Sequence, residues 1–411
     1  MAFTCPYCYE KFSRDEFEFR CESFTSTACQ EEDPKLARYF GVPHYLANRV
    51  IPNKSWRDVM TKKSLWKAFG KMSRMLVVPD EVKCDRCGGP SRKKICPRCH
   101  NELPTYFHKA ESHIISVIGA RGSGKTHYIT VLIHELLKRG YKLDISTIPQ
   151  DVGEDRSKVT SKRYSEEYKR PLLDRGEELT KTTIAKDLNP LIYQITSSQK
   201  GFGKTKALYL VFYDTAGENF HDDQELKKLA NYVANSSGII FLLDTFQIPH
   251  IKNSLRSAGN AITESGIDFQ GVFQQVYNLL EKQGLVKLKA RSPVPIALTF
   301  SKIDEVIRNN LLDDDIEDFS IRKNSKYLEE GFYDQAELEE VSHDMRSLLT
   351  LWEEEGFIAG VESKFSQTAY FGVSALGATP KGGKIEDVRP LRVLDPLVWI
   401  LDKIGFALPK K

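Results

Sequence analysis

The chain has 411 residues, of which 59 are Lys or Arg, 56 are Asp or Glu and 41% are hydrophobic. The formal charge of +3 is too small to indicate a nucleic-acid or membrane partner by itself, and the composition is that of a folded rather than a disordered chain. At roughly 150 residues per domain, this length predicts two or three folded units.

The distribution of apolar residues and cysteines indicates a cellular compartment. The longest strongly apolar run, residues 238–243, is far too short to cross a bilayer, and no charged leader with an apolar stretch follows Met1. All eight cysteines lie between Cys5 and Cys99, which favours metal binding in a reducing compartment over scattered disulfides. We therefore expect a soluble, cytoplasmic protein without a transmembrane segment.

The first cysteine cluster is a C-x-x-C pair, Cys5 and Cys8, followed by two more loosely spaced cysteines, Cys21 and Cys29. Four thiolates are a usual shell for structural Zn²⁺, so these residues predict one zinc site. Their pairing stays open, because Cys5 and Cys8 could instead join the next C-x-x-C pair of the chain. Free buried thiols or redox pairs are the alternative interpretation.

A basic segment, residues 35–75, holds ten Lys or Arg residues and one acidic residue, with aromatic residues interleaved. Basic residues beside stackable rings are typical of a surface for nucleic acid or for an acidic partner. The alternative is a set of short helices with inward rings and solvated lysines. The lack of a helical stripe among Trp56, Leu65, Trp66 and Phe69 favours this alternative.

Two further C-x-x-C pairs are separated by eight residues that include two glycines and a proline. Each pair can form a tight knuckle with two thiolates on one side, and the short connection brings four sulfurs together. The spacing predicts a closed, structural Zn²⁺ site formed by Cys84, Cys87, Cys96 and Cys99. We predict a zinc-binding N-terminal module over residues 1–105 and a second domain over residues 106–411.

A strand-like run, residues 112–118, leads directly into a G-x-x-x-x-G-K-T sequence, and apolar residues then recur with a helical period. This is the context that a P-loop requires. Its backbone N–H groups can bind phosphate oxygens, Lys125 can bridge β- and γ-phosphates, and Thr126 can hold Mg²⁺. The predicted nucleotide-binding residues here are Gly119, Ala120, Arg121, Gly122, Ser123, Gly124, Lys125, Thr126 and His127.

Two strand-like runs follow, residues 191–196 and 207–213. A second G-K-T between them lacks the first glycine, so it predicts only a hairpin turn. The second run leads into the sequence D-T-A-G-E at residues 214–218. Asp214 suits the Walker-B role of holding Mg²⁺ through water, and the Gly217 N–H can bind the γ-phosphate.

Three more apolar strands are predicted further along the chain, at residues 238–244, 294–300 and 370–373. The second leads into Ser301, Lys302 and Asp304, and the third leads into Ser374, Ala375 and Leu376. Strands that alternate with helical segments predict an α/β fold with a parallel, doubly wound sheet. Such a sheet binds its ligand at the carboxyl ends of its strands.

Taken in order, the P-loop, D-x-x-G, S-K-x-D and S-A-x sequences resemble those of the P-loop GTPases of the Ras-like and translation-factor (TRAFAC) class. The resemblance covers residues 112–408 and implies GTP and GDP as ligands, with Mg²⁺. It implies that Asp304 accepts hydrogen bonds from guanine N1 and N2, that the Lys302 stem stacks on the base, and that the Ala375 N–H meets O6. A carboxylate at that place rejects adenine, whose N1 is itself an acceptor.

Three positions depart from this family pattern. Ser301 replaces the usual Asn, which in the family braces the P-loop, so we expect modest guanine affinity. Arg121 stands where Ras-like GTPases have Gly; it could crowd the γ-phosphate, supply a charge in cis, or point to solvent or a partner. Glu218 replaces the water-orienting Gln, and because a carboxylate accepts but cannot donate, we expect slow hydrolysis without a partner.

The resemblance also implies a switch I threonine that binds Mg²⁺ through its hydroxyl and the γ-phosphate through its N–H. Thr182 and Thr183 are the best candidates, and Thr180 stays open. The stretch at residues 150–185 is long and charged for this position, so we expect an enlarged switch I region or a partner surface there.

Two features complete the C-terminal part of the sequence. The acidic run at residues 313–318 favours a solvated loop over a metal site, because it lacks ligand spacing and a turn glycine. Residues 394–401 predict a closing helix with Pro396 in its first turn.

Zinc knuckles followed by this P-loop and D-T-A-G resemble the bacterial double-GTPase group of the same class. That resemblance implies a partner such as a second GTPase, an activator or an effector, within multi-component conflict or anti-phage systems. The leading interpretation is a GTP-hydrolysing molecular switch whose zinc ribbons dock a protein partner. The alternatives are a nucleic-acid-binding NTPase, a scaffold that binds nucleotide without turnover, and an ATPase; the sequence predicts no oligomeric state.

Overall fold

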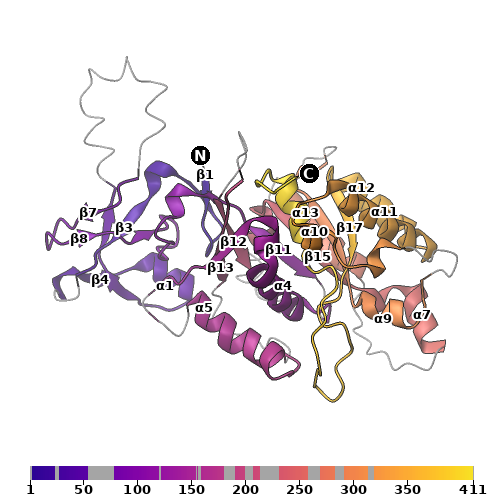
Figure 1. Cartoon of the computed structure of the whole chain (residues 1–411). Coiled ribbons are helices and arrows are strands. Elements are labelled where there is room, and N and C mark those ends of the chain that lie inside the picture. Colours follow the sequence, from indigo (N-terminus) through magenta and orange to yellow (C-terminus); the bar gives the residue numbers. More distant parts are fainter. Residues whose placement is uncertain are drawn as a thin grey trace. The chain divides into compact units, whose positions relative to one another are not determined.

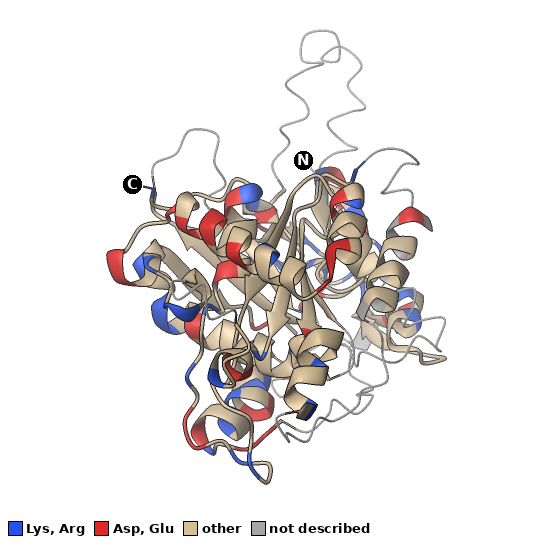
Figure 2. Ribbon diagram, turned by 90° about the vertical axis from the view of Figure 1, so that its right-hand side faces the viewer, with Lys and Arg blue, Asp and Glu red and all other residues tan. Residues whose placement is uncertain are grey.

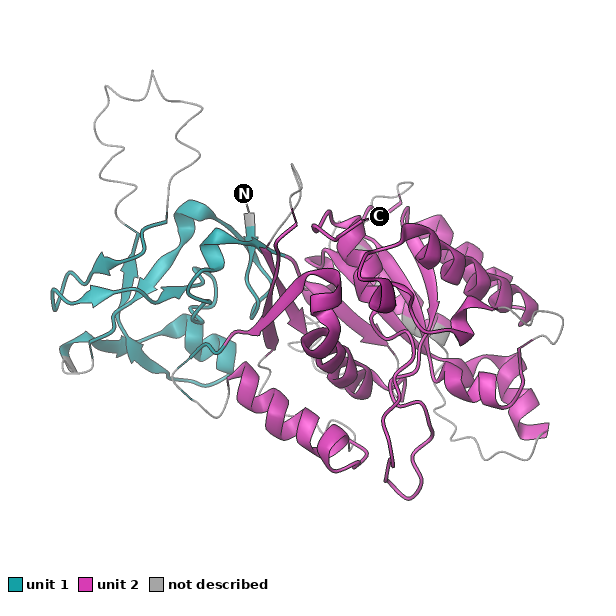
Figure 3. Cartoon of the chain, in the orientation of Figure 1, with its two compact units in different colours: residues 1–112, 151–156 teal, residues 113–150, 157–411 magenta. Residues whose placement is uncertain are grey.

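The computed structural model describes residues 2–23, 27–53, 78–119, 122–153, 155, 159–179, 190–199, 207–212, 231–257, 269–282, 291–312 and 319–410. The chain divides into two compact units, residues 1–112 with 151–156 and residues 113–150 with 157–411 (Figure 3). The first stretch of unit 1 thus ends at Ser112, whereas the sequence predicts a boundary between residues 105 and 106.

Unit 1 is built from short antiparallel strand pairs, β1 with β2, β4 with β5, β7 with β8, and β3 between β6 and β9. Their bounds are β1 Ala2–Thr4, β2 Lys11–Ser13, β3 Glu18–Arg20, β4 Gln30–Glu32, β5 Leu46–Asn48, β6 Val50–Pro52, β7 Val82–Lys83, β8 Pro90–Ser91 and β9 Lys94–Ile95. A further strand, β10 (Glu111–Ser112), comes at the end of the first stretch of this unit. Strands of two or three residues bury little apolar surface, so the unit needs other sources of stability.

The helix α1 (Pro34–Phe40) and a cluster of aromatic rings contribute to the core of unit 1. The carboxylate of Asp33 accepts the N–H groups of Lys35 and Leu36 at the start of the helix, and Gly41 ends it with a φ of 66°. Asp33 also lies 2.9 Å from the guanidinium of Arg20, with both side chains buried. Phe17 packs edge-on against Phe3 and Phe12 with ring centroids 5.1 and 5.0 Å apart.

Unit 2 is an α/β unit with a parallel sheet in the order β11-β15-β16-β17 (Figure 1). The strands are β11 (Ile115–Gly119), β15 (Gly238–Asp244), β16 (Ile296–Ser301) and β17 (Thr368–Gly372). Every residue of β11, β15 and β16 is buried, so both faces of the sheet are covered, as expected for parallel strands. The predicted α/β class and the predicted strands are confirmed.

Three antiparallel strands lie on the β11 side of this sheet. They are β12 (Ile145–Pro149), β13 (Leu191–Ser197) and β14 (Ala207–Phe212), with β13 in the middle and β14 beside β11. The antiparallel pairing of β13 with β14 confirms the predicted hairpin, whose connecting residues 200–206 lie outside the described part of the chain.

Helices pack against the parallel sheet, among them α4, α11 and α13 (Figure 1). Within the described residues of unit 2, the α-helices are α4 Lys125–Arg139, α5 Thr160–Arg163, α7 Pro249–Ser257, α8 Phe269–Lys282, α9 Ile303–Arg308, α10 Tyr327–Glu330, α11 Gln335–Leu351, α12 Glu355–Lys364 and α13 Asp395–Lys403. A Cβ atom at Gly238 would lie 2.3 Å from Ile400, so glycine at the start of β15 permits the close approach of α13.

The predicted closing helix is present as α13, with Pro396 in its first turn. Its first residue, Asp395, is fully buried and lies 2.7 Å from Arg392, which also lies 3.2 Å from Glu337 of α11. Tyr327 donates its hydroxyl to Asp395 at 2.6 Å. One guanidinium therefore balances two buried carboxylates and joins α11 to α13, and the Tyr327 hydroxyl adds α10 to this network.

The charged stretch before β13 is helical over much of its length, although its sequence suggests a long loop. α5 continues into a segment with π-type hydrogen bonds, Tyr164–Asp174, which contains Pro171. Tyr164, Tyr168 and Leu172 are buried, and the Tyr164 hydroxyl donates to the carbonyl of Thr130 on α4 at 3.0 Å. The spacing of four between these apolar residues forms one face of a helix, which the many intervening charges conceal.

Charges are mixed over the surface, and Figure 2 shows acidic and basic residues interspersed along the helices in view. Among the residues that the structure describes, no helix is long and apolar enough to cross a bilayer.

Candidate nucleotide site and cysteine centres

The glycine-rich loop joins the end of β11 to the start of α4, which is the strand–loop–helix order of a P-loop. A Cβ atom at Gly119 would lie 2.3 Å from the carbonyl oxygen of Leu242 on β15, so no larger residue fits there. Gly122 and Gly124 have φ values of 78° and 81°, which side chains rarely allow. The three predicted glycines are thus required by the backbone.

The lysine of this loop has its ammonium group folded back over the loop. Lys125 is 7% exposed, and its Nζ donates to the carbonyl oxygen of Gly119 at 2.8 Å. Thr126 follows in the first turn of α4, where the N–H groups of the helix start and the helix dipole favour an anion. The positive charge and the helix start therefore converge on the space above the loop.

The structure describes some, but not all, of the other predicted residues near Lys125. Ser123 is fully buried, while Ala120 and Arg121 lie outside the described residues. The next residue along α4, His127, accepts the N–H of Leu179 through Nε2 at 3.3 Å. Burial and the positive charge of Lys302 lower the pKa of His127 to about 4, so the ring is neutral and able to accept at pH 7.

The carboxyl ends of four neighbouring parallel strands meet at one edge of the sheet. Gly119 is opposite Leu242, Asp244 is opposite Ser301, and the residue before Ser301 is opposite Gly372. The P-loop, the S-K-x-D sequence and the S-A-x sequence all leave the sheet at this edge. Ligand sites of parallel α/β sheets lie at such edges, so the structure brings the predicted phosphate and base residues to the same side.

Lys302 lies directly after β16 and contacts two residues that sequence reasoning missed. Its φ is 61°, and its Nζ lies 2.8 Å from a carboxylate oxygen of Asp244 and 5.0 Å from the centre of the Phe246 ring. Asp244 is the last residue of β15, and an acid at the end of a buried parallel strand was the signal that could have identified it. Asp244 and Phe246 therefore hold the Lys302 side chain in place.

Asp304 lies in the first turn of α9 with its side chain 14% exposed, and Arg308 reaches one of its oxygens at 3.2 Å. Burial raises the pKa of Asp304, while a hydrogen bond with Ser374 opposes that shift. Ser301, which replaces the expected Asn, donates its hydroxyl to the carbonyl of Leu243 at 3.1 Å. Ser301 is thus hydrogen-bonded to the neighbouring strand β15.

The S-A-x loop is held by paired backbone hydrogen bonds. Ser374 and Leu391 exchange N–H and carbonyl groups at 3.0 and 2.9 Å, and the Ser374 hydroxyl accepts the N–H of Gly377 at 2.8 Å. Ala375 and Leu376 are half-buried beside it. A side-chain hydrogen bond also links Ser374 to Asp304.

The remaining predicted residues of the nucleotide site lie outside the described part of the chain. They are Thr180, Thr182, Thr183, Asp214, Gly217 and Glu218, and the acidic run 313–318 lies outside it as well. Their roles stay predictions.

The eight cysteines form two groups of four, but the predicted grouping is wrong. One group consists of Cys5, Cys8, Cys96 and Cys99, and the other of Cys21, Cys29, Cys84 and Cys87. The outer pairs of the sequence share one group and the inner pairs share the other, so the arrangement is nested. Neither the sequential grouping nor the alternative that joined Cys5 and Cys8 to the third pair is correct.

The sulfur positions test whether each group fits a metal ion. All four sulfurs of a group lie within 4.8 Å of one another. A tetrahedral Zn²⁺ with Zn–S bonds of about 2.3 Å requires sulfurs about 3.8 Å apart, whereas a disulfide requires about 2.05 Å. The separations are 3.7 Å for Cys5–Cys99, 3.8 Å for Cys8–Cys96, 3.6 Å for Cys21–Cys87 and 3.9 Å for Cys29–Cys84. Both groups therefore fit a tetrahedral thiolate shell.

Three of the four cysteine pairs lie in the same type of turn. The N–H of the first cysteine donates to the carbonyl five residues later, and the N–H four residues later returns to the first carbonyl, at 2.9 to 3.1 Å. The fourth residue after the first cysteine has a positive φ: Tyr9 62°, Gly88 73° and His100 59°. The grouping itself depends on strand pairing. β9, which precedes Cys96, pairs antiparallel with β3, which precedes Cys21. The two cysteines therefore follow opposite ends of the strand pair, and they belong to different groups.

Only part of the basic segment is described, residues 35–53. Two of its cationic side chains, Lys35 and Arg49, contact oxygen atoms within unit 1. Lys35 donates to the carbonyl of Pro97 at 2.7 Å, and Arg49 lies 3.1 Å from Asp85 and 3.4 Å from Glu31. Trp56 and Trp66 lie outside the described residues. These contacts give no support to the nucleic-acid alternative.

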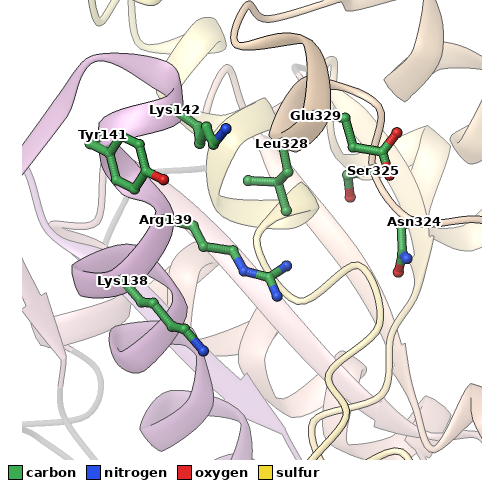
Figure 4. Close-up of a pocket in the computed structure, with 8 residues that line it drawn as sticks. All are labelled: Lys138, Arg139, Tyr141, Lys142, Asn324, Ser325, Leu328 and Glu329. Carbon is green, nitrogen blue, oxygen red and sulfur yellow. The ribbon is translucent and has the colours of Figure 1, made fainter.

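A pocket of about 280 Å³ lies at the far end of α4 from the P-loop (Figure 4). Lys138, Arg139, Tyr141 and Lys142 line one wall, and Asn324, Ser325, Leu328 and Glu329 line the other. At a rise of about 1.5 Å per residue, Lys138 lies roughly 20 Å along the helix from Lys125. The pocket is therefore separate from the predicted nucleotide site.

These features define a class of site: a P-loop α/β unit with a Lys-x-Asp loop at the same sheet edge, in one chain with a module of two four-cysteine groups. None of the protein-family models matches the sequence. The chain is 26% identical over 332 residues, 76% of this chain and 80% of the other, to a Mycolicibacterium smegmatis protein named "Putative ESX-1 scaffolding and assembly protein SaeC".

Solved structures of GTP-binding proteins are among those that align with part of the chain. The Arl6 BBS3 small GTPase of Trypanosoma brucei with bound GppNp aligns with 71% of this chain and 97% of its own, at 10% identity and a TM-score of 0.29. The signal recognition particle receptor SRb-GTP/SRX complex of Chaetomium thermophilum aligns with 66% and 94%, at 14% identity and 0.29. Scores of this size do not establish a shared fold, so the class of site rests on the geometry above.

Proposed function

We propose that the protein is a guanine-nucleotide-binding molecular switch that hydrolyses GTP to GDP and phosphate with Mg²⁺. The observation that supports this most is the convergence of Lys125, Lys302, Asp304 and Ser374 at one edge of the parallel sheet. One pair of strand ends offers a phosphate cradle, and the neighbouring pair offers a base site. A purine nucleotide has both chemical ends that such a site requires.

Base selection would come from the Asp304 carboxylate. An ionised carboxylate can accept two hydrogen bonds from guanine, from N1–H and from the amino group at C2. Adenine has an acceptor at N1 and no amino group at C2, so it would leave the buried carboxylate without partners. Arg308 and Ser374 hold the carboxylate in one orientation, and Asp244 with Phe246 does the same for the Lys302 stem.

Phosphate binding and turnover would use the loop and its flanking residues. Lys125 would bind β- and γ-phosphate oxygens, and Thr126 with Asp214 would hold Mg²⁺, which supplies charge compensation at the phosphates. Thr182 or Thr183 and the Gly217 N–H would bind the γ-phosphate and change position when it leaves. Glu218, which cannot donate a hydrogen bond, motivates the proposal that turnover is slow without a partner.

We propose further that the two cysteine groups bind Zn²⁺ and that unit 1 docks a protein partner. Eight thiolates in two closed tetrahedral sets leave no open coordination position, which suits structural rather than catalytic zinc. The name of the Mycolicibacterium smegmatis relative describes a scaffolding and assembly protein, which supports a protein partner. A second GTPase as partner and membership of a defence system are supported only by the resemblance of the motifs.

The test is equilibrium binding of GTP, GDP and ATP, each with Mg²⁺, to the full chain and to Asp304→Ala. Loss of two hydrogen bonds to a charged group, at about 1.5–3 kcal/mol each, predicts that the variant loses at least about a hundredfold in guanine preference. Asp334→Ala is the matched control, because it also removes an acid at a helix start, on α11, far from the site in sequence. Equal binding of GTP and ATP by the unaltered protein would contradict the proposal.

A further inference from the structure

The loop that follows Ser374 extends into a long hairpin, residues 377–390, which appears as the yellow loop below the sheet in Figure 1. The hairpin closes through Lys381 and Lys384, which exchange backbone hydrogen bonds at 2.9 and 3.1 Å. Its two ends are tied by the Ser374–Leu391 pair and by the Arg389 N–H, which donates to the carbonyl of Leu376 at 2.9 Å. The hairpin is therefore an ordered extension of the predicted base-binding loop.

The return strand of the hairpin pairs with a segment far away in the sequence, residues 176–178. The Ile385 N–H donates to the carbonyl of Gly176 at 2.8 Å, and the Glu178 N–H donates to the carbonyl of Gly383 at 2.9 Å. The side chains of Lys384 and Glu177 add an ion pair at 3.4 Å, which is exposed and contributes little. Two backbone hydrogen bonds thus join the base-side loop to this segment.

Gly176 shows that this contact needs a close approach. Its φ is 62°, and a Cβ atom there would lie 2.2 Å from the carbonyl oxygen of Ile385. Any other residue would push the two backbones apart and lengthen both hydrogen bonds. Gly382, at the tip of the hairpin, has nearly the same φ of 58° but no atom within 4 Å of such a Cβ.

The start of the hairpin is hydrogen-bonded to the helix that carries Asp304. Arg308 donates to the carbonyl of Gly377 at 2.9 Å, and the same Nη2 lies 3.2 Å from the Asp304 carboxylate. Thr379 donates its hydroxyl and its N–H to Glu305 at 2.5 and 3.2 Å. An interaction that fixes the Asp304 carboxylate therefore also fixes the start of the hairpin at Gly377.

The other end of the connection lies at the P-loop helix. Leu179, next to the paired segment, donates its N–H to Nε2 of His127, two residues after Lys125. Residues 176–179 are thus held between the hairpin and the first turn of α4. In sequence they directly precede Thr180, Thr182 and Thr183, the predicted threonine ligands.

We propose that hairpin 377–390 is a positioning element that couples occupation of the base site to residues 176–179. This inference rests on the proposed guanine-nucleotide function. Guanine at Asp304 and Ser374 stabilises Arg308, the start of the hairpin, and the pairing of the hairpin with Gly176. Residues 176–179 are therefore held in place by GDP as well as by GTP. By linkage, breaking the pairing weakens nucleotide binding by the same factor. Coupling between sites is typically about 5- to 150-fold, and for two hydrogen bonds we expect GDP to dissociate about tenfold faster.

The first experiment uses the unaltered full chain and amide hydrogen exchange. The amides of Glu178, Leu179 and Ile385 should exchange more slowly with GDP than without nucleotide, and equally slowly with GTP. Protection by GTP alone would overturn the proposal, because it would show that the γ-phosphate rather than the base holds the segment. Unchanged exchange in the presence of bound GDP would overturn it as well.

The second experiment compares Gly176→Ala with Gly382→Ala, which impose similar backbone strain. Gly176→Ala should lose the protection of these amides and release GDP about tenfold faster, while Gly382→Ala should resemble the unaltered protein. Equal GDP release from both variants would overturn the proposal. A chain that binds no guanine nucleotide would contradict the proposed function itself, an outcome distinct from binding without coupling.

Discussion

The nested arrangement of the cysteines predicts a distinctive loss of zinc in double variants. In Cys8→Ser/Cys99→Ser both substitutions fall in one group, whereas in Cys8→Ser/Cys29→Ser they fall in two different groups. The nested arrangement predicts that the first variant keeps one Zn²⁺ of two and the second keeps none. The sequential grouping predicts the reverse, so the two variants control for each other.

The magnitude follows from the number of thiolates left in each group. Structural Zn²⁺ binds with an apparent free energy of about 10–16 kcal/mol. If four thiolates share it equally, a group with two remaining keeps about 5–8 kcal/mol, which corresponds to dissociation constants from roughly 0.2 mM to 1 μM. A group with three keeps about 8–12 kcal/mol, so its site weakens less than a group with two but still loses Zn²⁺ to a strong chelator.

The assay is zinc per chain, measured by elemental analysis after dialysis against a chelator strong enough to empty three-thiolate sites. Sulfur separations of 3.6 to 3.9 Å in the two groups predict a stoichiometry of two for the unaltered protein. More zinc in Cys8→Ser/Cys29→Ser than in Cys8→Ser/Cys99→Ser would refute the nested grouping.

Three further predictions concern unit 2. Arg392→Ala leaves two buried carboxylates without their cation, so urea denaturation should show a loss of about 3–5 kcal/mol in the free energy of unfolding. Asp244→Asn removes the partner of Lys302, and calorimetry should show GTP affinity lowered roughly tenfold, or about 1.4 kcal/mol. Burial raises the pKa of Asp304, so its carboxylate should become protonated at a pH above the ordinary aspartate value of about 3.9. GDP affinity measured against pH should therefore begin to fall above that pH on acidification. An affinity that stays unchanged down to a pH of about 3.9 would contradict this.

The strands and the phosphate loop could be predicted from the sequence because their signals are local. Apolar runs such as residues 238–244 mark buried strands, and the two glycines of the loop mark backbone that only glycine adopts. The same locality explains the confirmed hairpin of β13 and β14. The carboxyl-end edge of a parallel sheet then places Lys302 and Asp304 on the side of Lys125 without further information.

The features that the sequence did not predict depend on contacts between distant segments. The cysteine grouping follows from the pairing of β3 with β9, which no C-x-x-C spacing encodes. Asp244 contacts Lys302 only because the neighbouring strand β16 brings that lysine to the end of β15. The pairing of Gly176 with Ile385 joins segments that are separated by most of unit 2.

The central claim, that Asp304 reads guanine, is tested most directly by the preference of Asp304→Asn for XTP over GTP. Xanthine keeps the N1–H of guanine but has a carbonyl at C2 in place of the amino group. An asparagine amide can accept from N1–H and donate to that carbonyl, whereas the carboxylate cannot donate. We predict that the unaltered protein prefers GTP and that the variant prefers XTP. An unchanged preference in a folded variant would contradict the assignment of Asp304 to the base site.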